Sequence, residues 1–69
     1  MGNKSCFTKT ERKVIITLYE LGRFATINEI ARLSQISWNT SNKIIKIFYE
    51  KSILLKEELD GRIYYKINL

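Results

Sequence analysis

The pattern of apolar and polar positions predicts three helices followed by a pair of strands. The first helix is expected over residues 8–21. Thr8 and Glu11 form a T-x-x-E capping box at its start, in which the side chain of each residue accepts a hydrogen bond from the free backbone amide of the other. Gly22 supplies the left-handed residue that commonly ends a helix.

The apolar surface of this first helix is wider than one buried face requires. Its core-facing stripe is expected to consist of Val14, Ile15, Leu18 and Leu21. Ile16 and Tyr19 lie further round the helix, so the apolar arc is about twice the width of a single buried stripe. We therefore expect a homodimer in which Ile16 and Tyr19 form the interface.

Two more helices are predicted in the middle of the chain. A second capping box, formed by Thr26 and Glu29, opens a short helix over about residues 27–33. After a turn, Ser37 is the expected N-cap of a third helix over about residues 38–51. The residues expected to face inward are Ile27, Ile30 and Ala31 on the second helix and Ser41, Ile44, Ile45 and Phe48 on the third.

Beyond the third helix the pattern changes to β-branched and aromatic runs on either side of Asp60 and Gly61. Asp-Gly is a strong signal for a two-residue hairpin turn, which Leu59 and Arg62 would flank. In that register Leu54, Ile63, Tyr65 and Ile67 share one face and are expected to cover the core. With a short extra strand at residues 23–25, the prediction is an α+β winged helix-turn-helix: three helices and a C-terminal β-hairpin wing.

Three segments resemble winged-helix transcription regulators of the MarR and ArsR types. Residues 29–40 look like the helix-turn-helix core of those proteins, and residues 49–54 and 60–65 are similar to the end of their third helix and to their wing. The resemblance covers about residues 7–68. It implies sequence-specific binding of double-stranded DNA, with the third helix in the major groove and the wing on the backbone or in the minor groove.

Three residues depart from the family pattern. Gln35 stands in place of a turn glycine, Ser41 in place of a core valine or similar residue, and Ser52 in place of a capping glycine. We expect strain in the turn and weaker packing beneath the third helix. Family members carry additional helices for dimerisation or ligand sensing, and this sequence ends with the wing, so a DNA-reading domain alone is expected.

Charge points to an anionic partner. Lys and Arg total 12 against 7 Asp and Glu, for a net charge of +5, which favours nucleic acid over a membrane surface or an acidic protein. From residue 52 onward three basic residues balance three acidic ones, so the positive charge lies on the helices and on the N-terminal arm. The arm is expected to be flexible over residues 1–7, and the domain to occupy residues 8–69.

The candidate DNA-binding residues centre on the third helix. Asn39, Asn42, Lys43 and Lys46 fall on the face opposite its core residues, where Asn can read adenine edges and Lys can reach guanine or phosphate. The alternative is an ordinary solvated face. Trp38 either packs on a thymine methyl or a sugar, or folds back as a lid on the core. The other candidates are Thr26, Ser37 and Thr40 at helix N-termini and Arg62 in the wing.

Several classes of function lack the residues they need. Histidine is absent, which removes the commonest general base and the commonest metal ligand, and Cys6 is the only cysteine. We therefore expect no enzyme, no metal, no cofactor, no small-molecule ligand and no membrane partner, and a cytoplasmic protein associated with DNA. Cys6 could form an intermolecular disulfide in the dimer or stay an unpaired thiol. A protein-interaction module and an RNA-binding winged helix remain the alternatives.

Overall fold

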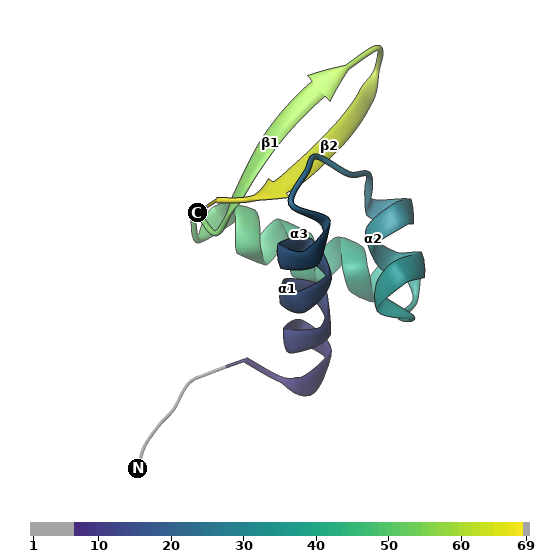
Figure 1. Ribbon diagram of the computed structural model, residues 1–69, viewed down its shortest axis with the longest axis vertical. Coiled ribbons are helices and arrows are strands. Elements are labelled where there is room, and N and C mark those ends of the chain that lie inside the picture. Colours follow the sequence, from purple (N-terminus) through teal and green to yellow (C-terminus); the bar gives the residue numbers. More distant parts are fainter. Residues whose placement is uncertain (1–6, 69) are drawn as a thin grey trace.

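Three helices and a two-stranded hairpin follow one another along the chain (Figure 1). The computed structural model describes residues 7–68. Its elements are α1 (Lys9–Leu21), α2 (Ile27–Ser34), α3 (Trp38–Glu50), β1 (Leu54–Leu59) and β2 (Arg62–Ile67). The helices pack together and the hairpin projects away from them, which is the predicted winged helix-turn-helix architecture.

The ends of α1 confirm the prediction from sequence. The Glu11 amide donates to Thr8 Oγ1 at 3.1 Å, and the Thr8 amide donates to Glu11 Oε1 at 2.8 Å, so the capping box is complete. Gly22 is left-handed with φ of +60°, and its amide donates to the Leu18 carbonyl at 3.1 Å. Of the side chains expected to face the core, Val14 and Leu18 are buried, and Ile15 and Leu21 are half-buried against the same cluster.

The second predicted capping box is wrong in one half. The Glu29 amide does donate to Thr26 Oγ1 at 3.2 Å, but the Glu29 carboxylate accepts from the Arg23 guanidinium at 2.6 and 3.2 Å. The guanidinium is charged and donates two hydrogen bonds, so it binds a carboxylate more strongly than a neutral backbone amide does. The hydrogen bond from Arg23 holds the pKa of Glu29 below its ordinary value, and the same bond raises the pKa of Arg23.

The turn between α2 and α3 carries the strain expected from the missing glycine. Gln35 is left-handed with φ of +61°, a conformation that disfavours residues with a Cβ. Its amide and that of Ile36 close the turn by donating to carbonyls of α2. Ser52, the other residue in place of a glycine, is also left-handed with φ of +63°. α3 itself begins as predicted, since Ser37 Oγ accepts from the Thr40 amide at 3.1 Å.

The hairpin has the predicted register. Leu59 pairs with Arg62 across Asp60 and Gly61, both of which have positive φ, as a tight hairpin turn requires. The predicted strand at residues 23–25 is reduced to a single bridge. There the Ala25 amide donates to the Tyr65 carbonyl at 2.8 Å, and the Tyr65 amide returns a bond of 2.7 Å. This bridge fastens β2 to the segment that leads into α2.

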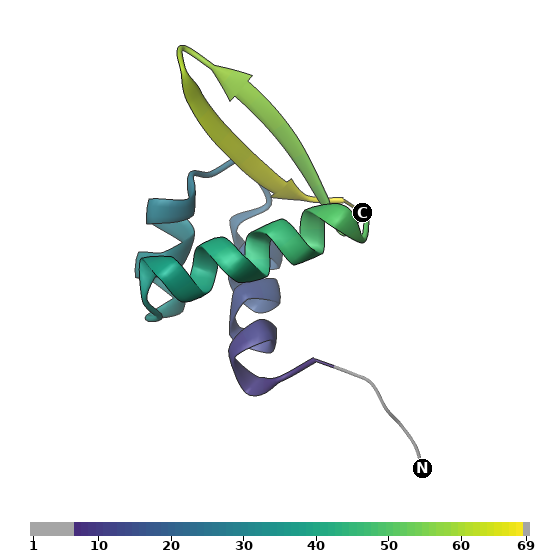
Figure 2. The ribbon, with the colours of Figure 1, turned by 180° about the vertical axis from the view of Figure 1, so that it is seen from behind.

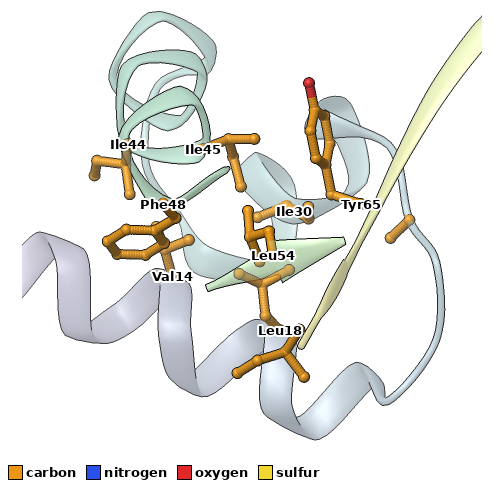
Figure 3. Packing of buried hydrophobic residues seen from close by; sticks show 10 residues of the cluster. Val14, Leu18, Ile30, Ile44, Ile45, Phe48, Leu54 and Tyr65 are labelled. Carbon is orange, nitrogen blue, oxygen red and sulfur yellow. The ribbon is translucent and has the colours of Figure 1, made fainter. Parts of the chain in front are cut away.

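The core lies between the three helices and the base of the hairpin (Figure 3). Leu54, Tyr65 and Ile67 cover it from the hairpin as predicted. Ile63 does not, because its side chain is 39% exposed. Strand alternation places Ile63 on the same face, but it lies two residues nearer the wing tip than Tyr65, where the hairpin has left the helices (Figure 1).

Two further residues define the edges of this core. The Phe7 ring, expected in the arm, packs edge-on against Phe48 with the ring centroids 5.7 Å apart. Ser41 is fully buried on the inner face of α3, and within residues 7–68 its hydroxyl has no hydrogen-bond partner. The serine that departs from the family pattern thus leaves a polar atom inside an apolar core.

Candidate nucleic-acid interface

The predicted polar face of α3 is open to solvent. Asn39, Lys43 and Lys46 are exposed, and Asn42 is half-buried. The opposite side of the helix carries Ser41, Ile44, Ile45 and Phe48, all buried against the other elements. In Figure 2, α3 crosses in front of α1 with the hairpin above it.

The hydroxyls predicted at helix N-termini all serve as caps or pair with caps. Thr26 Oγ1 accepts from the Glu29 amide, and Ser37 Oγ accepts from the Thr40 amide. Ser37 Oγ also donates to Thr40 Oγ1 at 2.9 Å. Ser37 and Thr40 are exposed at the start of α3, on either side of Asn39 in the sequence. The Ser37 hydroxyl already donates to Thr40, which leaves the Thr40 hydroxyl able to donate a hydrogen bond to a ligand.

A hollow of about 420 Å³ separates the start of α3 from the wing. Its lining comes from three segments: Thr26, Ile27 and Asn28 at the start of α2, Trp38 at the start of α3, and Arg62 and Ile63 on β2. Trp38, Thr26 and Arg62 were predicted from the sequence only as separate contacts. The hollow that they form with Ile27, Asn28 and Ile63 was not predicted. No signal in the sequence brings residues 26, 38 and 62 together, because only the packing of the hairpin does so.

Trp38 lies in the wall of this hollow and not in the core. Its side chain is 48% exposed, and it does not belong to the cluster of buried residues. The exposure favours a role in contacting a ligand over that of a lid on the core.

Two lysines of the hairpin lie over aromatic rings of the helical part of the domain and of the segment before α2. Lys56 Nζ lies 5.2 Å from the ring centroid of Tyr49 at the end of α3. Lys66 Nζ lies 5.8 Å from the ring centroid of Phe24, in the segment before α2. Both distances are within the range of cation–π attraction. These contacts hold Lys56 and Lys66 against aromatic rings near the base of the wing. Of the three basic residues of the wing, Arg62 at the tip is therefore the one most available to contact a ligand.

The outer face of α1 carries the predicted apolar excess. Ile16 is 55% exposed and Tyr19 is 63% exposed. Leu33 on α2, which the sequence analysis did not single out, is 48% exposed and lines a smaller hollow of about 220 Å³ together with Ile16. Cys6, the third predicted interface residue, lies outside the described residues.

The described part of the chain offers little for other chemistry. Within residues 7–68, no three His, Cys, Asp or Glu side chains are grouped so that they could hold a metal ion. None of the helices described is long and apolar enough to cross a membrane.

Comparison with known proteins bears on the fold alone. No family model matches this sequence, and no curated protein matches it. Among solved structures, the ST1889 protein of the thermoacidophilic archaeon Sulfolobus tokodaii superposes with a TM-score of 0.77 at 22% identity, over 90% of this chain and 62% of that one. ZitR of Lactococcus lactis, crystallised in complex with DNA, superposes with TM-scores of 0.70 for a mutant and 0.68 for the wild type.

The two ZitR complexes are 18% and 17% identical to this chain, and each match covers 99% of the chain and 49% of ZitR. The chain thus spans about half to three fifths of the length of the structures it matches. These likenesses establish that the chain has the winged helix-turn-helix fold.

Proposed function

We propose that this chain binds double-stranded DNA in a sequence-specific manner and acts as a transcription regulator. The observation that carries the proposal is the exposed polar face of α3, with two amides and two ammonium groups opposite a fully buried face. The fold shared with ZitR, which was crystallised in complex with DNA, supports it. So does the net charge of +5.

In this proposal α3 enters the major groove. Asn39 is exposed and reads an adenine edge by paired hydrogen bonds, while the half-buried Asn42 reaches less far. Lys43 and Lys46 contact guanine acceptors or phosphates, and much of the affinity comes from release of counterions. Arg62 in the wing contacts the backbone or the minor groove. We assign the protein no catalytic role and no cofactor, and propose that it acts on DNA in the cytoplasm.

Selection of bound sites from a random DNA pool tests this proposal. Each of Asn39, Asn42, Lys43 and Lys46 is then changed to Ala, with Lys51→Ala, an exposed lysine just after α3, as the matched control. Loss of a bidentate amide contact should cost about 1–3 kcal/mol at one base position. Loss of a phosphate contact should weaken all sites alike and lower the slope of log K against log salt by about one.

The outcome also distinguishes the alternatives. Circular dichroism and the melting temperature establish that each variant is folded. If all four variants bind a selected site like the parent, α3 is not the reading element. If the parent binds no duplex even at low salt, the protein-interaction module is favoured, and preferential binding of RNA would favour the third alternative.

We further propose that the chain forms a homodimer through the outer face of α1. Ile16 lies at the centre of this face, opposite the buried Val14 and Leu18. If two copies of α1 pack antiparallel about Ile16, the basic first half of each helix lies beside the partner's Tyr19 and the partner's Glu20. Apolar contact at the centre and opposite charges at the ends make this face self-complementary, as a two-fold interface requires.

Sedimentation at micromolar concentration tests the dimer. Ile16→Glu should give a monomer, because two carboxylates would meet at the two-fold axis. Leu59→Glu is the matched control, since Leu59 at the wing tip is 59% exposed and Ile16 is 55% exposed. A parent that stays monomeric, or a dimer that tolerates Ile16→Glu, removes α1 as the interface.

A further inference from the structure

The hollow between α2, α3 and the wing has the composition of a binding site. Two of its walls are apolar side chains left out of the core: Trp38, 48% exposed, and Ile63, 39% exposed. One cation, Arg62, lies at its edge, and no carboxylate is among its lining residues. Thr26 and Asn28 add two uncharged polar side chains to the lining. A lining that is part apolar and carries a single cation fits a ligand that is partly apolar and carries one negative charge.

The position of the hollow indicates which part of DNA meets these properties. On the proposed function, on which this inference rests, α3 occupies the major groove and the wing lies toward the adjacent minor groove. A single strand of the duplex separates two such grooves. That strand must therefore cross the space between Trp38 on α3 and Arg62 on β2, which is the hollow.

We propose that the hollow seats one deoxyribose-phosphate unit of this strand. The phosphate accepts hydrogen bonds from the Arg62 guanidinium, whose forked geometry suits two phosphate oxygens. The deoxyribose, which has no 2′-hydroxyl, packs against the indole of Trp38 and the side chain of Ile63. The bases of a duplex are paired inside the stack and do not reach this site. Trp38 and Ile63 are then positioning residues that set where along the duplex α3 reads.

The chain itself supplies the reporter for this site. Trp38 is its only tryptophan, so tryptophan fluorescence reports on the hollow alone. Acrylamide quenching of Trp38 is measured with and without a duplex taken from the selected pool, while anisotropy of a dye on the DNA measures binding separately. We expect quenching to fall about twofold or more on binding, because the exposed part of the indole becomes covered.

Variants of the phosphate contact complete the test. Arg62→Ala should weaken binding about tenfold, as expected for loss of a charge-assisted hydrogen bond. Arg32→Ala is the matched control, since Arg32 is an exposed arginine on α2 that lines neither the hollow nor the proposed dimer face. A scan with single neutral methylphosphonate linkages should find one linkage whose neutralisation weakens the parent and leaves the Arg62→Ala variant unaffected. Ile63→Ser, checked for folding by its melting temperature, should restore part of the quenching of Trp38 in the complex.

Each failure has a distinct meaning. If the duplex binds and the quenching of Trp38 is unchanged, the hollow is not the seat, although DNA binding stands. If the corresponding single strand protects Trp38 as well as the duplex does, the indole stacks on unpaired bases and the deoxyribose-phosphate proposal is overturned. If no DNA binds at low salt, the proposed function fails and the seat fails with it.

Discussion

Replacing Ser41 with Ala should make the protein more stable. Ser41 is fully buried on the inner face of α3, and its hydroxyl has no hydrogen-bond partner within residues 7–68. In the unfolded chain that hydroxyl binds water, so folding removes hydrogen bonds that the described part of the chain does not replace. Alanine has the same backbone and Cβ without the polar atom.

The magnitude follows from two contributions. Leaving a buried hydroxyl unsatisfied costs about 1–3 kcal/mol, and Ala exceeds Ser in helix propensity by about 0.5 kcal/mol. Removing the oxygen also removes its van der Waals attraction to neighbouring atoms, about 0.1–0.2 kcal/mol for each atom pair, which offsets part of this gain. We expect the free energy of unfolding to rise by about 1–2 kcal/mol. For a domain of this size, the melting temperature would then rise by roughly 5–15 °C.

Ser34 provides the matched control. It is also buried, at 5% exposed, but its Oγ donates to Thr17 Oγ1 at 3.0 Å. Ser34→Ala loses that hydrogen bond, which costs about 0.5–1.5 kcal/mol, and gains at most about 0.5 kcal/mol in helix propensity, so the free energy of unfolding should fall by up to about 1 kcal/mol. The two substitutions make the same chemical change at two buried helical sites, and the predicted signs differ because only one hydroxyl has a partner.

The assay is urea unfolding followed by circular dichroism, with every variant at the same protein concentration because a dimer gains stability by mass action. An unchanged slope against urea would show that the folded and unfolded states keep their compactness. The reasoning is refuted if Ser41→Ala is no more stable than the parent. It is equally refuted if Ser34→Ala gains as much, since helix propensity would then account for both.

Two further predictions concern the backbone and one ion pair. Gln35→Gly and Ser52→Gly should each raise the free energy of unfolding by about 0.5–1 kcal/mol, since glycine adopts a positive φ without strain; unchanged melting temperatures would contradict this. The pKa of Glu29 is lowered by Arg23, so the pair stabilises the fold above the ordinary carboxyl value of 4.5 and stops doing so as the pH falls through the lowered pKa. The Glu29→Gln variant should therefore be less stable than the parent at pH 7, and this difference in stability should disappear in acid. Urea unfolding of both proteins at both pH values measures the difference. An equal difference at the two pH values would disprove the pairing.

Much of the fold could be predicted because its signals are local. The Thr8–Glu11 capping box and the Gly22 stop involve neighbours in sequence, and the Asp-Gly turn sets the pairing of every residue in the hairpin. The polar face of α3 was predictable for the same reason, because helical periodicity separates Asn39 from the buried Phe48.

What could not be predicted depends on distances across the fold. Alternation assigned Ile63 to the inner face of the hairpin, but only the packed structure shows where the helices beneath that face end. The Glu29 side chain had two donors within reach, a backbone amide and the Arg23 guanidinium, and the spacing of residues 26 and 29 says nothing of the second. The hollow at Trp38 escaped prediction because its walls come from three separate segments.

The Ala25–Tyr65 bridge anchors the wing at one end, near the base of the hairpin. Its base is clamped by two backbone hydrogen bonds and by the burial of Leu54 and Ile67, whereas nearly all of the ribbon between that base and its tip is exposed. A two-stranded ribbon has little stability of its own, so we expect the hairpin to flex beyond this anchored base more than the helices do. Trp38, on a packed helix, then forms the rigid wall of the hollow, and Ile63, on the hairpin, forms the flexible wall. On the proposed binding mode, we expect the width of the hollow to adjust to a DNA backbone whose groove widths vary with sequence, without moving the helix proposed to read the bases.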